Sequence, residues 1–286
     1  MQMTIFRTTL IITAVCFLVA CNNQQSTFSN SGASASSLAG KLIVTGSSTI
    51  APLAAELAKQ FESMHSNVKI DVQTGGSSRG ISDVRQQISD IGMVSRQLKA
   101  AETDLSSHLL AKDGVSIIVH KNNPISELSE QQIKQIYLGE ITNWKKLGGH
   151  DVKITVINKA EGRSTLEVFL KHFQLKNTAI KPTIIIGDNE QAIKLVANNT
   201  SAIAYVSIGT AEYDIALNVP IRTLPLNGIE ASTKTVLSNQ FPLSRELNLI
   251  TKGELSTLSK AFIEYTRNST ISSTIEEFGF VPVVTR

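Results

Sequence analysis

The sequence has little cysteine and little net charge, and each shortage excludes a class of protein. Its 286 residues include two cysteines, Cys16 and Cys21, which form no Cys-x-x-Cys pair. Neither a disulfide framework nor a paired-thiol redox site is therefore expected. The formal net charge is +3, and no basic stretch is interleaved with the aromatic residues, which make up 5% of the chain. The sequence thus gives no indication of a nucleic-acid partner.

The motifs of metal and cofactor enzymes are also missing from the sequence. The five histidines show neither the His-Glu-x-x-His spacing nor the cysteine neighbours that would predict a zinc site. The segment Gly75–Gly80 is rich in glycine, but the Lys-Ser/Thr of a nucleotide-binding P-loop does not follow it. We therefore predict no metal, no cofactor and no enzymatic activity.

The first 20 residues are typical of a secretory signal peptide. Arg7 supplies the positive charge, and the apolar run over residues 10–20 is too short for a membrane span, which needs about 20 residues. The run ends in Leu18-Val19-Ala20-Cys21, which resembles the lipoprotein box of exported bacterial proteins. In that box the cysteine carries lipid, so we expect Cys21 to be the lipid attachment site. The alternative is an ordinary cleavage nearby that leaves Cys21 as a free thiol.

Residues 21–39 are mostly Ser, Asn, Gln, Ala and Gly, which predicts a flexible tether. We therefore expect the folded part to work outside the cytoplasm, in the periplasm or at the cell surface. Its contact with the membrane would be through the lipid anchor alone.

From residue 40 onward, short β-rich runs alternate with helical patterns. Such alternation predicts an α/β fold with mainly parallel sheets, and the chain length favours two domains. Val68, Ile70 and Val72 alternate with polar residues, as in a half-buried strand. The expected strands are 41–45, 68–74, 115–119, 152–157, 183–186, 202–206 and 247–250; helical patterns cover 53–64, 81–88, 166–173 and 258–265.

Three loops between an expected strand and an expected helix share an unusual composition of glycine and hydroxyl residues. N-capping explains one hydroxyl at such a place, but each loop offers two or three. Free N–H groups and a partial positive charge make a helix N-terminus an anion site, and guanidinium groups suit tetrahedral oxyanions. If the loops converge, together with Arg79, Arg96 and Arg163, they would hold an inorganic oxyanion. The loops are Thr45-Gly46-Ser47-Ser48-Thr49, Gly75-Gly76-Ser77-Ser78-Arg79-Gly80 and Gly162-Arg163-Ser164-Thr165.

A second interpretation comes from residues 76–80, which match the Gly-x-Ser-x-Gly pattern of a hydrolase nucleophile elbow. The pattern arises easily in a loop rich in serine and glycine, and no histidine shows a matching signature. A serine hydrolase therefore stays as the alternative from another functional class.

Six segments, taken in order, resemble the PstS family of type 2 periplasmic binding proteins, the phosphate-binding proteins of ABC transporters. The resemblance covers the chain from about residue 40 to its C-terminus. The segment at 139–144 is the most specific to the family, and we interpret Trp144 as a packing residue. The segments are 46–53, 75–80, 90–96, 136–144 with Gly148 and Gly149, 202–206 and 241–245.

The resemblance implies a two-lobed α/β fold with the ligand in the cleft between the lobes. Lobe 1 would comprise residues 40–119 plus 247–286, and lobe 2 residues 120–246, with the crossings near 115–120 and 247–251. The implied function is capture of inorganic phosphate and its delivery to an ABC transporter permease, by a protein that we expect to be a monomer. The expected phosphate-binding residues are Ser48, Thr49, Ser77, Arg96, Arg163, Ser164 and Thr165.

Two departures from the family pattern bear on the ligand. Well-known members have an Asp, which accepts the proton of hydrogen phosphate, where this chain has Arg96, and an Arg where it has Lys159. Glu161 or Asp188 could replace that acceptor, and Arg96 could instead form a surface or lobe-bridging ion pair. Without the carboxylate, other tetrahedral oxyanions, namely sulfate, molybdate and tungstate, stay open as ligands.

Overall fold

The computed structural model describes residues 38–283. The predicted signal peptide, the lipid attachment site at Cys21 and all of the predicted tether except its last two residues lie outside this range. Among the described residues, no helix has both the length and the apolar composition needed to cross a bilayer.

The described chain folds on two main hydrophobic cores. The first takes its residues from 42–111 and 247–280, and the second from 115–243 with Val281. We call the parts built on these cores lobe 1 (residues 38–114 and 244–283) and lobe 2 (residues 115–243).

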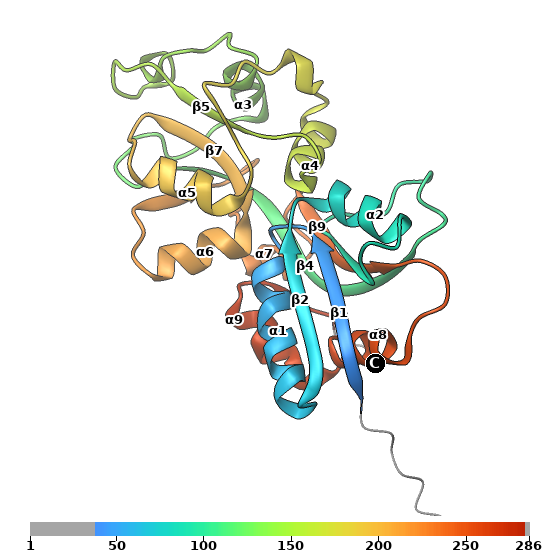
Figure 1. The fold of residues 1–286 in the computed structure, drawn as a ribbon. Helices are drawn as coiled ribbons and strands as arrows, with labels where there is room; N and C mark the ends of the chain where they lie inside the picture. The colour runs from blue at the N-terminus through green and yellow to red at the C-terminus, as the bar shows by residue number, and fades with distance from the viewer. Residues whose placement is uncertain (1–37, 284–286) are drawn as a thin grey trace, which may run out of the picture. The chain divides into compact units, whose positions relative to one another are not determined.

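Lobe 1 joins the two ends of the described chain, because α8 packs on β1 and α9 packs on α1 (Figure 1). Its elements are β1 (Ala39–Gly46), α1 (Ala51–Met64), β2 (Asn67–Thr74), α2 (Ser77–Arg85), β3 (Ile91–Val94), β9 (Ser244–Thr251), α8 (Thr257–Tyr265), η3 (Ser269–Ile271), α9 (Ser272–Glu277) and β10 (Val281–Pro282). The helical face predicted for α1 is confirmed at Leu53, Leu57 and Phe61, which are buried, and is wrong at Met64, the last residue of the helix, which is 56% exposed.

Lobe 2 is continuous in sequence. Its elements are α3 (Glu130–Tyr137), η1 (Trp144–Leu147), β5 (Thr155–Lys159), α4 (Ser164–Phe173), η2 (Asn177–Ala179), β6 (Ile184–Ile186), α5 (Asn189–Ala197), β7 (Ala202–Ser207), α6 (Ile208–Ala216), β8 (Ile221–Leu224) and α7 (Thr233–Leu237). Four aromatic rings from α3, α4 and β7 pack together at its centre, and Phe169 stacks on Tyr205 with ring centroids 4.1 Å apart.

A single long strand, β4 (Ser106–His120), belongs to both lobes. Its first part, up to Gly114, pairs with β9, and from Val115 onward it pairs with β7 and then β8. The strand order is β2-β1-β3-β9-β4-β7-β5-β6, with β8 and β10 also paired to β4. The backbone hydrogen bonds that connect the two lobes therefore pass through β4, which pairs with β9 of lobe 1 and with β7 and β8 of lobe 2.

The prediction of mainly parallel sheets holds only for the outer strands. β1 is parallel to β2 and β3, and β5 is parallel to β6 and β7. At the centre, β4 and β9 run antiparallel to every strand they pair with. They do so because one strand carries the chain out of lobe 1 and the other brings it back. The first half of β4 and the strands β3, β8 and β10 were not predicted.

Trp144 tests how lobe 2 is stabilised. Its side chain is 1% exposed in the core of this lobe, and its Nε1 donates to the Ser201 carbonyl at 2.9 Å. Trp144→Ala should lower the free energy of unfolding by about 3–5 kcal/mol, measured by urea denaturation. The control Tyr213→Ala, at a side chain 51% exposed, should change it by less than about 0.5 kcal/mol. Equal losses in the two variants would contradict the packing role of Trp144.

Candidate functional site

The three glycine- and hydroxyl-rich loops meet in the structure. They follow β1, β2 and β5 and lead into α1, α2 and α4. Gly76 has a φ of +94°, and a β-carbon there would lie 2.7 Å from the Gly162 carbonyl oxygen of lobe 2. Only glycine allows this approach. The Ser78 amide then donates to the same Gly162 oxygen at 3.2 Å, which joins the second loop to the third.

Two charged residues that the sequence analysis did not single out stand at the centre of the site. Arg245 of β9 and Asp113 of β4 are cross-strand partners. The Arg245 Nη2 and Nε atoms lie 2.7 and 3.0 Å from Asp113 Oδ2, and the two side chains are 2% and 0% exposed. Asp113 Oδ1 accepts from the Gly209 amide, so both carboxylate oxygens are engaged.

Arg245 reaches hydroxyl groups of both lobes. Nη1 donates to Thr165 Oγ1 of α4 at 3.0 Å and to Ser95 Oγ at 3.4 Å, while Nη2 donates to Thr49 Oγ1 at 3.3 Å. Thr49 Oγ1 also accepts from Asn189 Nδ2 of α5 at 3.3 Å. The guanidinium therefore holds together hydroxyls from the first loop, the end of β3 and the third loop.

These bonds decide what the hydroxyls can still do. A hydroxyl oxygen has two lone pairs and one proton. Thr49 Oγ1 accepts from Arg245 and Asn189, and Ser95 Oγ accepts from Ser47 and Arg245. Both have their acceptor capacity filled, so their protons are left to be donated. A cluster of hydroxyls that can only donate is suited to an anion.

Ser77 and Ser164 complete the cluster at the first residues of α2 and α4. Ser77 Oγ accepts from the Ser95 amide at 3.2 Å. Ser164 is buried, and its Oγ has no hydrogen-bond partner among the described residues. Buried hydroxyls are normally paired, so an unpaired one at a helix N-terminus marks a place for a ligand atom.

The structure brings the other predicted hydroxyl and one predicted arginine to the edge of this cluster. Ser48 is half-buried in the turn that precedes α1. Arg163 is half-buried, and its side chain lies beside Gly76 and Gly187, where added β-carbons would come within 2.9 Å of its Cδ and 3.4 Å of its Nη2. Arg163 thus extends from the third loop to the second.

Arg96 has a different environment from the one expected of an anion-binding residue. Nη1 and Nη2 bind Glu102 at 2.8 and 2.9 Å, and Nε lies 3.0 Å from Oε2 of Glu167 in α4. Burial alone would lower the pKa of Arg96, but the hydrogen bond with Glu102 and the charge of Glu167 raise it. All three guanidinium nitrogens face carboxylates, as in the lobe-bridging ion pair considered from the sequence.

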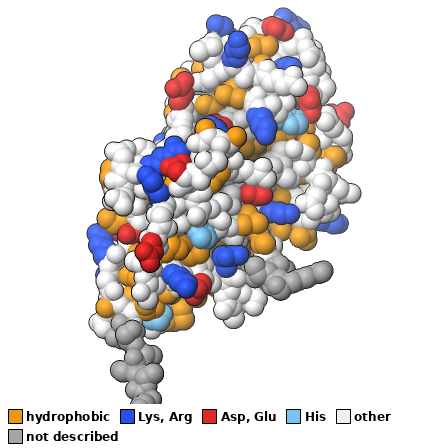
Figure 2. Space-filling model, turned by 90° about the vertical axis from the view of Figure 1, so that its right-hand side faces the viewer, with side chains coloured by type: hydrophobic (Ala, Val, Ile, Leu, Met, Phe, Trp, Pro, Cys, Tyr) orange, Lys and Arg blue, Asp and Glu red, His pale blue; other side chains and the backbone are white. Residues whose placement is uncertain are grey.

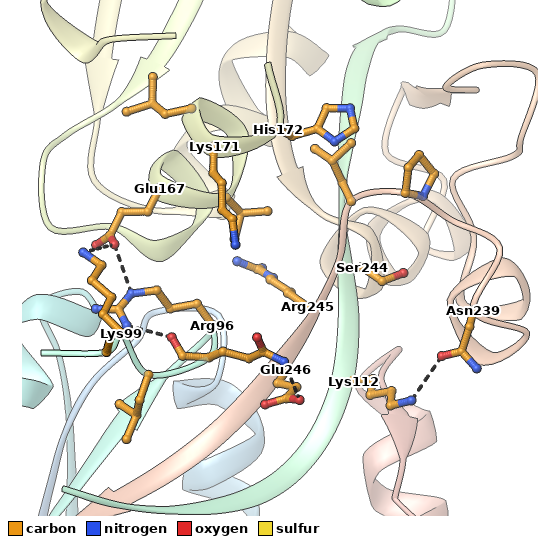
Figure 3. A pocket seen from close by; sticks show the side chains of 17 residues that line it. Arg96, Lys99, Lys112, Glu167, Lys171, His172, Asn239, Ser244, Arg245 and Glu246 are labelled. Atoms are coloured by element: carbon orange, nitrogen blue, oxygen red, sulfur yellow. Dashed lines mark hydrogen bonds and ion pairs between the residues drawn. The ribbon is translucent and has the colours of Figure 1, made fainter. Parts of the chain in front are cut away.

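A cavity lies beside the hydroxyl cluster. It has a volume of about 1070 Å³ and is lined by residues of both lobes, among them Arg96, Glu167, Lys171 and Arg245 (Figure 3). Thr49, Ser77, Ser164 and Thr165 are not among its lining residues. We therefore locate the candidate anion site by the hydroxyl geometry rather than by this cavity.

The serine-hydrolase alternative finds no support in the described residues. Ser78, the serine required by a nucleophile elbow, is exposed, and the side chains of His108, His120 and His172 form hydrogen bonds with Thr251, the Asn122 amide and Glu130. No group of three or more potential metal ligands occurs within residues 38–283. The face shown in Figure 2 carries acidic and basic side chains interspersed, rather than one basic patch.

Comparisons with known proteins agree on one family. A profile of the PBP (periplasmic binding protein) superfamily domain matches residues 31–269. The phosphate-binding protein PstS of Bacillus subtilis is 28% identical over 272 residues, which cover 92% of this chain and 89% of that protein. The chain belongs to the PBP superfamily and, within it, to the PstS family of solute-binding proteins.

Solved structures give the same result. An ABC transporter substrate-binding protein of Clostridium perfringens, solved with bound phosphate, superposes with a TM-score of 0.80 at 30% identity and covers 86% of this chain and 100% of its own. A phosphate transport receptor of Vibrio cholerae has a TM-score of 0.70 at 27% identity, covering 85% and 100%. The predicted two-lobed fold is thereby confirmed, as is the prediction of a binding protein rather than an enzyme.

The buried pair Arg245–Asp113 yields a test by double substitution. Arg245→Met alone leaves a buried carboxylate without its partner, which should cost about 3–5 kcal/mol of unfolding free energy. Arg245→Met combined with Asp113→Leu should lose less than the two single losses added together, because no unpaired charge remains. Urea denaturation of the four proteins measures this coupling. Additive losses would mean that the two charges do not stabilise each other.

Proposed function

We propose that this protein captures inorganic phosphate outside the cytoplasm and delivers it to the permease of an ABC transporter. The observation that carries the proposal is the hydroxyl cluster around Arg245, in which buried oxygens from both lobes are left with protons to donate. Membership of the PstS family, with a relative solved with bound phosphate, supports the same ligand.

In this proposal, Thr49, Ser77, Ser164 and Thr165 donate to the phosphate oxygens. The amides in the first turns of α2 and α4 add donors and a partial positive charge, except that of Ser78, which binds the Gly162 carbonyl. Ser48 and Arg163 are proposed contacts at the edge of the cluster. We leave Arg96 out of the contact set because its guanidinium already binds two carboxylates.

The carboxylates near the site favour a second candidate ligand, another tetrahedral oxyanion such as sulfate. Asp113 is engaged with Arg245 and the Gly209 amide, Asp188 accepts from the Gln191 amide, and Glu161 is exposed and accepts from Asn177. None of these three forms a hydrogen bond to a hydroxyl of the cluster, so no carboxylate of the described residues stands in position to accept the proton of hydrogen phosphate. A site without such an acceptor lacks the carboxylate that would repel the sulfate dianion.

The finer features of the proposal rest on the sequence. The run that ends at Cys21 supports export and lipid attachment, and residues 21–39 would tether the folded part to the membrane. Mass spectrometry of the mature N-terminus tests the anchor, and an unmodified Cys21 would exclude it.

Calorimetric titration tests the ligand and the site together. Phosphate should bind more tightly than sulfate or molybdate, and Ser77→Ala should weaken phosphate binding by about 1–3 kcal/mol, the loss expected for a hydrogen bond to a charged group. The control Ser82→Ala, at an exposed serine of the same helix, should leave the affinity unchanged. Unchanged affinity in Ser77→Ala would show that Ser77 does not contact the ligand. Tighter binding of sulfate than of phosphate would show that sulfate, and not phosphate, is the ligand.

Glu167 tests the coupling of lobe closure to capture. Its Oε2 lies 3.0 Å from Arg96 Nε and 2.6 Å from Lys99 Nζ, both in lobe 1, while Glu167 itself is in α4 of lobe 2. Glu167→Gln should speed phosphate dissociation several-fold and leave association nearly unchanged, because loss of one partner of a partly buried charge pair acts mainly on the off-rate. Stopped-flow kinetics measure both rates, with the exposed Glu140→Gln as control. An unaltered off-rate would show that the ion pair does not hold the lobes together.

A further inference from the structure

Lys159, at the end of β5, is a buried amine without a carboxylate partner. It is 3% exposed, and its Nζ donates to two uncharged oxygens, the Asp188 carbonyl at 2.7 Å and Asn189 Oδ1 at 2.9 Å. No ion pair of the described residues includes it. Because a buried ammonium is unfavourable without an opposite charge, this arrangement leaves a charge to be compensated.

The hydrogen bonds of Lys159 lead directly to the anion site. Asn189 accepts from Lys159 through Oδ1 and donates through Nδ2 to Thr49 Oγ1. One amide group therefore separates the amine from a hydroxyl at the centre of the cluster. The amide is also oriented by Lys159, since accepting at Oδ1 turns the Nδ2 donor toward Thr49.

Burial and the charged groups of the neighbouring segments together determine the pKa of Lys159. Burial is the largest cause that lowers its pKa, from the ordinary 10.5 to about 7. Asp188, the N-cap residue of α5, and Glu190 within that helix oppose the shift, while Arg245 of β9 and Arg163 of the third loop add to it. On β7, the Tyr205 hydroxyl accepts from the Lys159 amide, and Asp113 of β4 is engaged with Arg245.

We propose that Lys159 is the titratable cation of the anion site, and that capture of an anion draws a proton from solvent onto its amine. The bound anion supplies the missing opposite charge, so the ammonium form becomes favourable in the complex. This inference rests on the proposed function, namely that an oxyanion binds at the hydroxyl cluster.

The direction of the pH dependence follows from proton linkage. The free protein releases the Lys159 proton near pH 7, and the complex keeps it to a higher pH because the anion raises the pKa of the amine. Between these two values the complex holds more protons, so the Lys159 contribution weakens binding by up to about tenfold per pH unit as the pH rises. Below pH 7 the contribution is complete, because the amine is charged before the anion arrives.

The stability of the free protein should change in the opposite direction. The unfolded chain keeps the Lys159 proton up to about pH 10.5, whereas the folded free protein loses it near pH 7. The unfolded state then binds more protons between these values, so this group makes the free protein more stable as the pH rises. A merely structural lysine would not make affinity and stability respond to pH in opposite directions.

Titration calorimetry with inorganic phosphate at pH 6–9, in buffers of different ionisation enthalpy, measures the protons taken up per anion. The wild type is compared with Lys159→Met and with the exposed control Lys181→Met. The protonation equilibrium of phosphate itself is the same for all three proteins, so its contribution to the measured proton uptake cancels in the comparison. Above pH 7 the wild type and the control should take up more protons than Lys159→Met, which should also bind phosphate more weakly at pH 6.

Two further measurements keep the inference falsifiable if Lys159→Met does not fold. Lys159→Arg stays charged throughout this range, so its excess proton uptake should disappear. In the wild type, the NMR titration of the Lys159 ε-methylene should move to higher pH when phosphate is added. Equal proton uptake in wild type and variants, or an unmoved titration, would overturn the inference while phosphate still binds. Absence of heat with phosphate, sulfate and molybdate would instead overturn the proposed function.

Discussion

The buried pair of Arg245 and Asp113 is the interaction on which the candidate site depends. It joins the two strands that connect the lobes, and Asp113 leaves the far side of the guanidinium free to bind Thr49, Ser95 and Thr165. Arg245 therefore acts on a ligand through the hydroxyls that it orients. Its own charge is largely compensated by Asp113, so the site gains donors without gaining a second unpaired cation beside Lys159.

Helix α4 links the chemistry of the site to the contact between lobes. Ser164 and Thr165 lie in its first turn, and Glu167 lies within the same turn and binds Arg96 and Lys99 of the other lobe. A movement of α4 away from lobe 1 would separate the hydroxyls from Arg245 and break the ion pairs together. In the proposed function, ligand contacts and lobe contacts would therefore be made and lost in one step, which is how differential affinity shifts a two-state equilibrium.

The sequence predicted the local features of this protein well and its long-range pairs poorly. The alternation around Val68 and the glycine–hydroxyl loops are visible in short windows, so β2 and the loops that meet in the folded chain could be predicted. Phosphate binding by Thr49, Ser77, Ser164 and Thr165 stays a prediction. Arg245 and Asp113 are 132 residues apart, and no spacing rule joins them. The sequence could not show the ion pair of Arg96 with Glu167, because only the folded chain brings the two residues together. Arg96 was therefore expected to bind an anion.

The shared strand β4 also determines the order in which the protein can form as it is synthesised. Lobe 2 is continuous between residues 115 and 243, so its core, apart from Val281, is complete once those residues are available. Lobe 1 needs Leu247, Leu249 and Phe262, which come after the whole of lobe 2. Until then β3 and the first half of β4 lack β9, their common neighbour, and expose unpaired strand edges. The N-terminal half of lobe 1 is therefore the part of the chain most in need of protection before the C-terminus arrives.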